Sequence, residues 1–182
     1  IQIIDNFPRV EKAALPIKES VHLLSMTKLL NLQNLILLEL SINFTQFTCV
    51  QFLSNFKLPK SLRRIKWKLK GFKIGHPEVA ALEQFYKVWE ELENLTSLSI
   101  LMAEAYTTKQ YEDFFCEIVK RCHRLSRFKI DNSWYSGKHS PTVSYGVNLN
   151  PFLQAIKKSN APSKRLAFKG KTVTFKNINE LL

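Results

Sequence analysis

Very few residues of this chain have the types and spacing that catalysis or cofactor binding requires. The run Gly170–Thr172 matches the end of a phosphate-binding loop. The full loop needs another glycine five residues before Gly170, where Arg165 stands, and a helix must follow it to hold the phosphate. Residues 173–175 are instead predicted to be extended. We therefore expect no nucleotide site and no cofactor.

Two cysteines and a histidine lie close together in the sequence, as the ligands of a metal would. On a helix, however, Cys116 and Cys122 would lie about 120° apart, because six residues advance the chain by about 600°. A structural zinc site takes four ligands, and the sequence has no second pair of ligands elsewhere that would complete a site with these residues. We expect both cysteines to be core residues and no metal to be bound.

The remaining candidates for catalysis are also incomplete. His139 and Ser140 lie in a predicted loop with Asp131 nearby in the sequence, but no nucleophile–base motif surrounds them. No pair of carboxylates has a spacing typical of general acid–base catalysis. The sequence therefore favours a protein that is not an enzyme.

Basic residues, in contrast, are concentrated in two segments. The chain has 27 Lys and Arg against 15 Asp and Glu, a formal net charge of +12. Residues 57–73 contain eight basic and no acidic residues, and residues 157–176 contain seven and none. Residues 74–117 contain nine acidic residues and only two lysines. This charge favours an acidic partner, such as nucleic acid, an anionic membrane or an acidic protein segment. A solvated surface with no special partner is the alternative.

The basic segment 58–73, LPKSLRRIKWKLKGFK, has the pattern of a strand. Residues 65, 67 and 69 are apolar and alternate with lysines, so a strand would bring the apolar side chains to one face. A helix would spread them around more than half of its circumference. We expect Trp67 to be buried, and Lys66 and Lys68 to point to the opposite face.

The same pattern recurs along the chain. It is found at residues 35–42, 62–69, 95–102 and 125–132, and in a weaker form at 163–170. Helical periodicity occupies the segments between, at residues 17–31, 46–56, 78–93, 111–122 and 149–159. One strand and one helix at a period of roughly 30 residues are typical of a solenoid.

Two of these segments carry a family resemblance. LQNLILLELSIN at 32–43 and CHRLSRFKIDN at 122–132 resemble leucine-rich repeats, the second of the cysteine-containing type, and the resemblance covers roughly residues 20–170. It implies a curved α/β solenoid with parallel strands on the concave face and helices on the convex face. An ordinary α/β domain of about five strand–helix units is the alternative. We expect residues 1–182 to form a single such domain that belongs to a longer solenoid or larger protein.

The strand alternation predicts which residues line the concave face. They are Glu39, Ser41, Lys66, Lys68, Ser99, Leu101, Lys129, Asp131, Ala167 and Lys169. The loop 132–148 adds aromatic residues among Ser, Gly and Pro, a composition that is common in binding loops. The predicted partner-binding residues are Lys66, Lys68, Lys129 and Lys169 on the face, with Trp134, Tyr135 and Tyr145 on its rim.

Three functions agree with this surface. The first is a non-enzymatic scaffold that binds an acidic protein within a larger assembly. The second is a nucleic-acid-binding subunit of a ribonucleoprotein or DNA-bound complex. The third, implied by the family resemblance alone, is the substrate-recognition domain of a ubiquitin ligase. The three cysteines form no even disulfide framework, so we expect an intracellular protein, cytoplasmic or nuclear. No apolar run is long enough to span a membrane.

Overall fold

The computed structural model describes residues 9–19, 22–23, 25–44, 48–72, 78–102, 109–131, 150–157, 164–168 and 171–175. Strands and helices alternate along them, which confirms the α/β class. The elements are β1 (Lys12–Ile17), α1 (Ser25–Leu29), β2 (Leu37–Asn43), α2 (Cys49–Asn55), β3 (Arg64–Lys70), α3 (Val79–Glu90), β4 (Ser97–Met102), α4 (Lys109–Arg121), β5 (Arg127–Asp131), α5 (Asn150–Lys157), β6 (Lys164–Phe168) and β7 (Lys171–Phe175).

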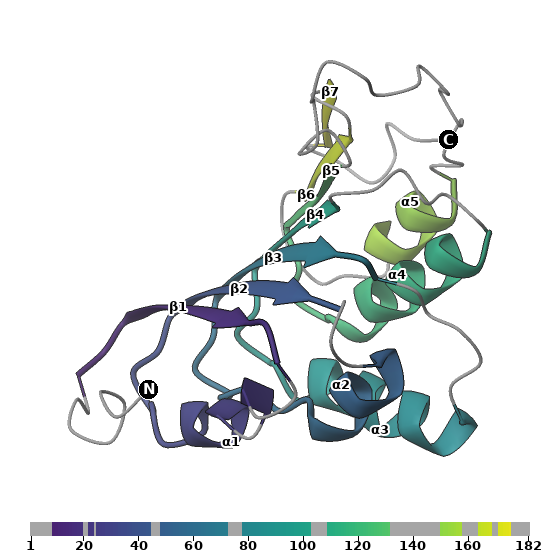
Figure 1. The fold of residues 1–182 in the computed structure, drawn as a ribbon. Helices are drawn as coiled ribbons and strands as arrows, with labels where there is room; N and C mark the ends of the chain where they lie inside the picture. The colour runs from purple at the N-terminus through teal and green to yellow at the C-terminus, as the bar shows by residue number, and fades with distance from the viewer. Residues whose placement is uncertain are drawn as a thin grey trace, which may run out of the picture.

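The strands form one sheet in which spatial order follows chain order. Strands β1 to β6 are parallel to their neighbours, and β7 pairs with β6 in the antiparallel direction. Helices α1 to α5 lie on one face of this sheet (Figure 1). We call the opposite face of the sheet the open face.

Four of the expected strands are confirmed as β2 to β5, and each begins about two residues after the start of its sequence pattern. The first leucine of the pattern belongs to the preceding turn. The amide of Leu35 donates to the carbonyl of Leu32, and Leu62, Leu95 and Leu125 make the same three-residue bond. These leucines are fully buried, so they anchor the turn rather than the strand.

The first unit was predicted incorrectly. Residues 17–31 were expected to be helical, but α1 occupies only Ser25–Leu29 and residues 12–17 form a strand, β1. Leu15 and Ile17 alternate with exposed neighbours and pack into the core. Pro16 lies between them and has no amide to donate. It is tolerated because β1 pairs with β2 alone among the described strands.

A second helix shows a clear start signal. Thr48 precedes α2, and its hydroxyl accepts a bond of 3.2 Å from the amide of Gln51, while the Gln51 side chain accepts one of 2.9 Å from the amide of Thr48. This reciprocal capping box satisfies amides that a helix start leaves without partners. It fixes the direction in which α2 leaves the loop and packs against the sheet.

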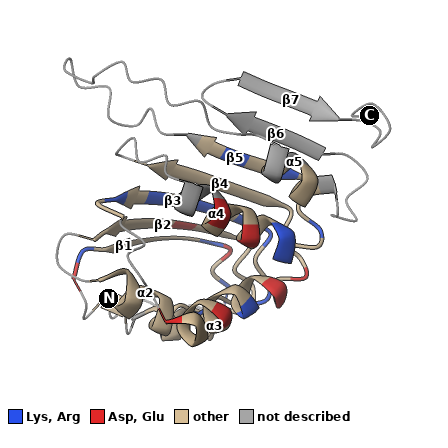
Figure 2. Cartoon of the chain, turned by 90° about the vertical axis from the view of Figure 1, so that its right-hand side faces the viewer, with Lys and Arg blue, Asp and Glu red and all other residues tan. Residues whose placement is uncertain are grey.

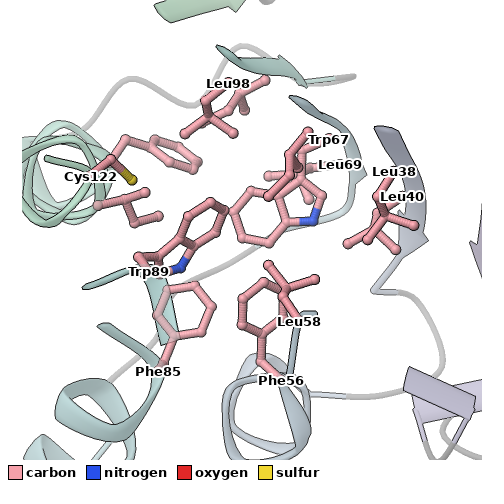
Figure 3. Close-up of a cluster of buried hydrophobic side chains, with 14 of the residues drawn as sticks. Leu38, Leu40, Phe56, Leu58, Trp67, Leu69, Phe85, Trp89, Leu98 and Cys122 are labelled. Carbon is pink, nitrogen blue, oxygen red and sulfur yellow. The ribbon is translucent and has the colours of Figure 1, made fainter. Parts of the chain in front are cut away.

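Aromatic rings fill the space between strand β3 and helices α2 and α3 (Figure 3). Trp67 of β3 is 1% exposed, which confirms its predicted burial. It stacks on Phe85 at 6.2 Å and contacts Phe56 at 5.5 Å and Trp89 at 5.2 Å. The indole nitrogens of Trp67 and Trp89 are buried without a hydrogen-bond partner in the described part of the chain. Ring packing therefore outweighs the loss of two indole–water hydrogen bonds.

The three cysteines are also buried, as expected for Cys116 and Cys122. Burial raises the pKa of the Cys49 thiol to about 12 and raises the pKa of the Cys122 thiol as well. Such thiols stay protonated at neutral pH, a state that suits neither metal binding nor nucleophilic attack.

Successive units are joined by one backbone arrangement. A single carbonyl in each unit accepts bonds of 2.8 to 3.1 Å from two consecutive amides of the next. The acceptors and their donor pairs are Glu11 with Ile36 and Leu37, Ile36 with Arg63 and Arg64, Arg63 with Thr96 and Ser97, and Thr96 with Ser126 and Arg127. The segments that precede β2, β3, β4 and β5 are thus aligned in the same way.

Candidate partner-binding face

The basic side chains of β3 all leave the strand on its open face. Ile65, Trp67 and Leu69 are 1–2% exposed on the helix side. The four alternating residues, Arg64, Lys66, Lys68 and Lys70, are half-buried or exposed. Alternate side chains on a strand lie about 6.6–6.8 Å apart along it. One strand therefore presents four cations in a line.

The sheet register extends this line sideways. Lys66 pairs with Ser99 of β4, which pairs with Lys129 of β5. Arg64 is connected in the same way through Ser97 to Arg127. Two strand steps of about 4.8 Å separate each pair of cations. The structure thus brings three predicted residues, Lys66, Lys68 and Lys129, into one region of the sheet.

Glu39 of β2 lies in this region and contacts two of the lysines. It pairs with Lys66 in the sheet register, and its Oε2 is 3.2 Å from the Lys66 Nζ. Its other carboxylate oxygen forms an ion pair with Lys68. The hydrogen bond from Lys68 is the main cause that lowers the pKa of Glu39, and Lys66 adds to it. The carboxylate therefore stays ionised and offsets part of the basic charge.

Sequence reasoning placed Glu39 on this face but did not predict its two ion pairs. The three side chains are 26–43% exposed, so each pair contributes at most about 1 kcal/mol. A partner with enough negative charge can therefore displace the Glu39 carboxylate at a small cost.

Several basic residues of the face were missed. Arg64 and Arg127 stand one alternation step before Lys66 and Lys129, and Lys70 stands one step after Lys68. Lys12 of β1 is exposed and is in register with Leu37 and Arg64. Extending each alternation to the ends of its strand would have found them in β3 and β5.

Four predicted site residues lie outside the described residues. They are Lys169 on the face and Trp134, Tyr135 and Tyr145 on the rim. Their part in binding stays a prediction. The geometry of the candidate face therefore rests on β2, β3, β4 and β5.

Acidic residues are gathered instead on the helices. The guanidinium of Arg121 in α4 donates to Glu117 at 3.1 Å, to Glu83 at 3.3 Å and to Glu90 at 3.4 Å. Its Cζ also lies 5.9 Å from the centre of the Tyr86 ring. The bonds to Glu83 and Glu90 connect α4 to α3, whereas the bond to Glu117 lies within α4. Figure 2 shows basic residues along β3 and β5, and acidic residues mixed with basic ones on α3 and α4.

The described residues contain no cluster of three or more His, Cys, Asp or Glu side chains that could hold a metal ion. None of their helices combines the length and the apolar character that crossing a membrane requires. No protein-family model matches the chain, and no curated protein matches it significantly.

Proposed function

We propose that this protein is a leucine-rich-repeat-like solenoid that acts as a non-enzymatic interaction module and binds an acidic protein segment on its open face. The observation that carries the proposal is the alignment of Arg64 and Lys66 on β3 with Arg127 and Lys129 on β5. Four cations at the corners of a patch about 10 Å across match carboxylates on a single extended segment.

The solenoid is supported by the way in which the units are joined. Strand order follows chain order, and the same carbonyl-to-two-amides arrangement precedes four successive strands. The sheet in Figure 1 bends with its open face on the inside and its helices on the outside. In a solenoid, this inner surface is the extended surface on which partners bind.

The chemistry of the face favours a protein partner over nucleic acid. The described strands β1 to β5 present no aromatic residue on the open face, and Trp67 is buried beneath it. Along these strands, bases of a single-stranded nucleic acid therefore find no ring on which to stack. Leu37 and Leu101 are half-buried on the open side of β2 and β4, where they provide apolar contact beside the charges. Protein interfaces commonly combine these two features.

Two triple variants test the face against net charge alone. In the first, Lys66, Lys68 and Lys129 become Ser. In the control, three exposed lysines outside the strands, Lys18, Lys57 and Lys87, become Ser, so the loss of charge is identical. The probe is a fluorescent peptide of alternating Glu and Leu, read by anisotropy. We expect the face variant to bind at least about tenfold more weakly, since each desolvated charge pair contributes about 1.5–3 kcal/mol.

Equal weakening by both triple variants would reject the face. A single-stranded RNA of the same charge serves as the competing probe. If RNA binds more tightly than the peptide, with affinity falling linearly in log salt, the nucleic-acid function replaces the proposed one.

A further inference from the structure

A polar hollow of about 410 Å³, whose lining includes none of Lys66, Lys68 and Lys129, lies at the edge of the sheet where strands begin. Its walls come from the segments that precede β1, β2, β3 and β4. These strands run in the same direction, so their amino ends share one edge (Figure 1). The hollow is therefore built from four consecutive units and is not confined to one loop.

The backbone of this edge is rigidly held. The carbonyl of Glu11 accepts from the amide of Ile36, and the carbonyl of Ile36 accepts from the amide of Arg63, at 2.8 and 2.9 Å. The half-buried Ile36 therefore lies between the two charged segments and contributes an apolar part of the lining. Because these backbone groups already bond to one another, they are not available to receive a ligand, and we turn to the side chains.

The side chains of the hollow have a particular chemistry. The polar groups of the lining are the guanidiniums of Arg9 and Arg63, the carboxylate of Glu11, the hydroxyl of Ser61 and the carboxamides of Gln33, Asn34 and Asn94. The Ser61 hydroxyl already donates to the Leu35 carbonyl at 2.8 Å. Both arginines are exposed and form no ion pair with any described residue. The net charge of the lining is +1, and Glu11 disfavours a multiply charged anion such as phosphate. A ligand with a single carboxylate, and so one negative charge, complements this net charge of +1.

The carboxamides suit a peptide backbone. Asn34 and Asn94 occupy equivalent places, each directly before a buried leucine. The Asn94 nitrogen donates to the Lys60 carbonyl at 3.5 Å, and its amide oxygen can still accept from a ligand N–H. Two strand steps, about 10 Å, separate the two asparagines, which is the length of about three extended residues.

We propose that this hollow binds the carboxylate of a short extended peptide, with Arg63 and Arg9 on the carboxylate and the carboxamides on the peptide backbone. The carboxylate comes either from a chain terminus or from an acidic side chain. A planar guanidinium matches both oxygens of a carboxylate, whereas a lysine would offer a point charge. The site is independent of the open face and does not rest on the function proposed for it.

The test is a titration of the full chain, labelled with ¹⁵N, with three acetylated tetraglycine peptides. One ends in a free carboxylate, one ends in an amide, and one ends in an amide but has a central Glu in place of Gly. We expect the amide resonances of Ile36 and Asn94 to move with either carboxylate-bearing peptide and not with the neutral one. The peptide that binds more tightly identifies the source of the carboxylate.

Variants separate the hollow from general charge. Arg63→Gln should weaken binding at least about tenfold, since it removes a charge-assisted pair of bonds. Arg64→Gln removes the same charge from the next residue, on the open face, and should change binding less than about twofold. Arg63→Lys should retain part of the affinity. The Arg63 backbone bonds are unchanged in all three variants, so native-state amide spectra report any loss of fold.

Several results would overturn the proposal. These are equal shifts with the neutral peptide, equal losses in Arg63→Gln and Arg64→Gln, absence of any shift, and larger shifts with inorganic phosphate at the same concentration. None of them bears on the open face, because the peptide of alternating Glu and Leu and the triple-lysine variants test that surface separately.

Discussion

The side chains on the two faces of strand β3 have very different surroundings. On the helix side, Trp67 touches Phe52, Phe56, Phe85 and Trp89, with ring centres 5.2 to 6.2 Å apart. On the open side, Lys66 and Lys68 touch a single carboxylate. Trp67 thus contacts four aromatic rings, whereas the lysines on either side of it share one carboxylate. We infer that substitutions on one face change stability, while those on the other change binding.

The largest effect is expected at the centre of the aromatic cluster. Trp67→Ala should lower the free energy of unfolding by about 3–5 kcal/mol, because it empties a large buried site that its neighbours cannot refill. Denaturant unfolding followed by circular dichroism measures this. A loss of less than about 1 kcal/mol would contradict the difference between the two faces.

The buried thiols provide a second measure of the helix side. Because burial raises the pKa of Cys49 from 9.0 to about 12, this residue should have about a thousandfold less thiolate than a free cysteine at neutral pH. Labelling by a thiol-specific reagent should slow by at least that factor, with mass spectrometry assigning the site. Addition of denaturant should restore the ordinary rate. Fast labelling of Cys49 in the native protein would contradict its burial.

A smaller effect on stability is expected at Glu39, the carboxylate of the open face that pairs with Lys66 and Lys68. Glu39→Gln should cost at most about 1 kcal/mol of stability, because both ion pairs are partly exposed. It should also strengthen binding of the acidic peptide, since Lys66 and Lys68 no longer have an internal competitor. Glu19→Gln, an exposed site away from this face, is the matched control. Equal gains in both variants would assign the effect to net charge.

The same carboxylate predicts a pH dependence. The pKa of Glu39 is lowered in the folded protein from its ordinary value of 4.5. Its contribution to stability is therefore present above about pH 4.5 and is lost as the pH falls through the lower, folded value. Unfolding measured across this range should show a slope that is reduced in Glu39→Gln. An unchanged slope would mean that the ion pairs add nothing in solution.

The smallest effect is expected at the exposed end of β3. Lys70→Ala should change the free energy of unfolding by less than about 0.5 kcal/mol, because the side chain is exposed and its carbonyl bond to the amide of Phe44 remains. Thermal melting compares it directly with Trp67→Ala. A loss near that of Trp67→Ala would remove the distinction between the two faces.

The pattern of residues 65–69 alone predicted the strand, the burial of Trp67 and the outward direction of Lys66 and Lys68. The period of a strand is a local property, since it depends only on the backbone geometry of adjacent residues. The same holds for α4, whose apolar spacing at 111–122 matches the helix Lys109–Arg121. Strand β1 was missed because its two buried residues, Leu15 and Ile17, form too short an alternation to be distinguished from a helix start.

The tertiary structure alone decided which charges meet. Glu39 and Lys66 are 27 positions apart, and their contact depends on the register between β2 and β3. The polar hollow likewise joins Arg9 to Asn94 through four chain segments. A local pattern states on which side of a strand a residue lies, but a shift of register by two residues would keep every side chain on its face and change every neighbour. That register is set by the packing of the whole core, which no single segment encodes.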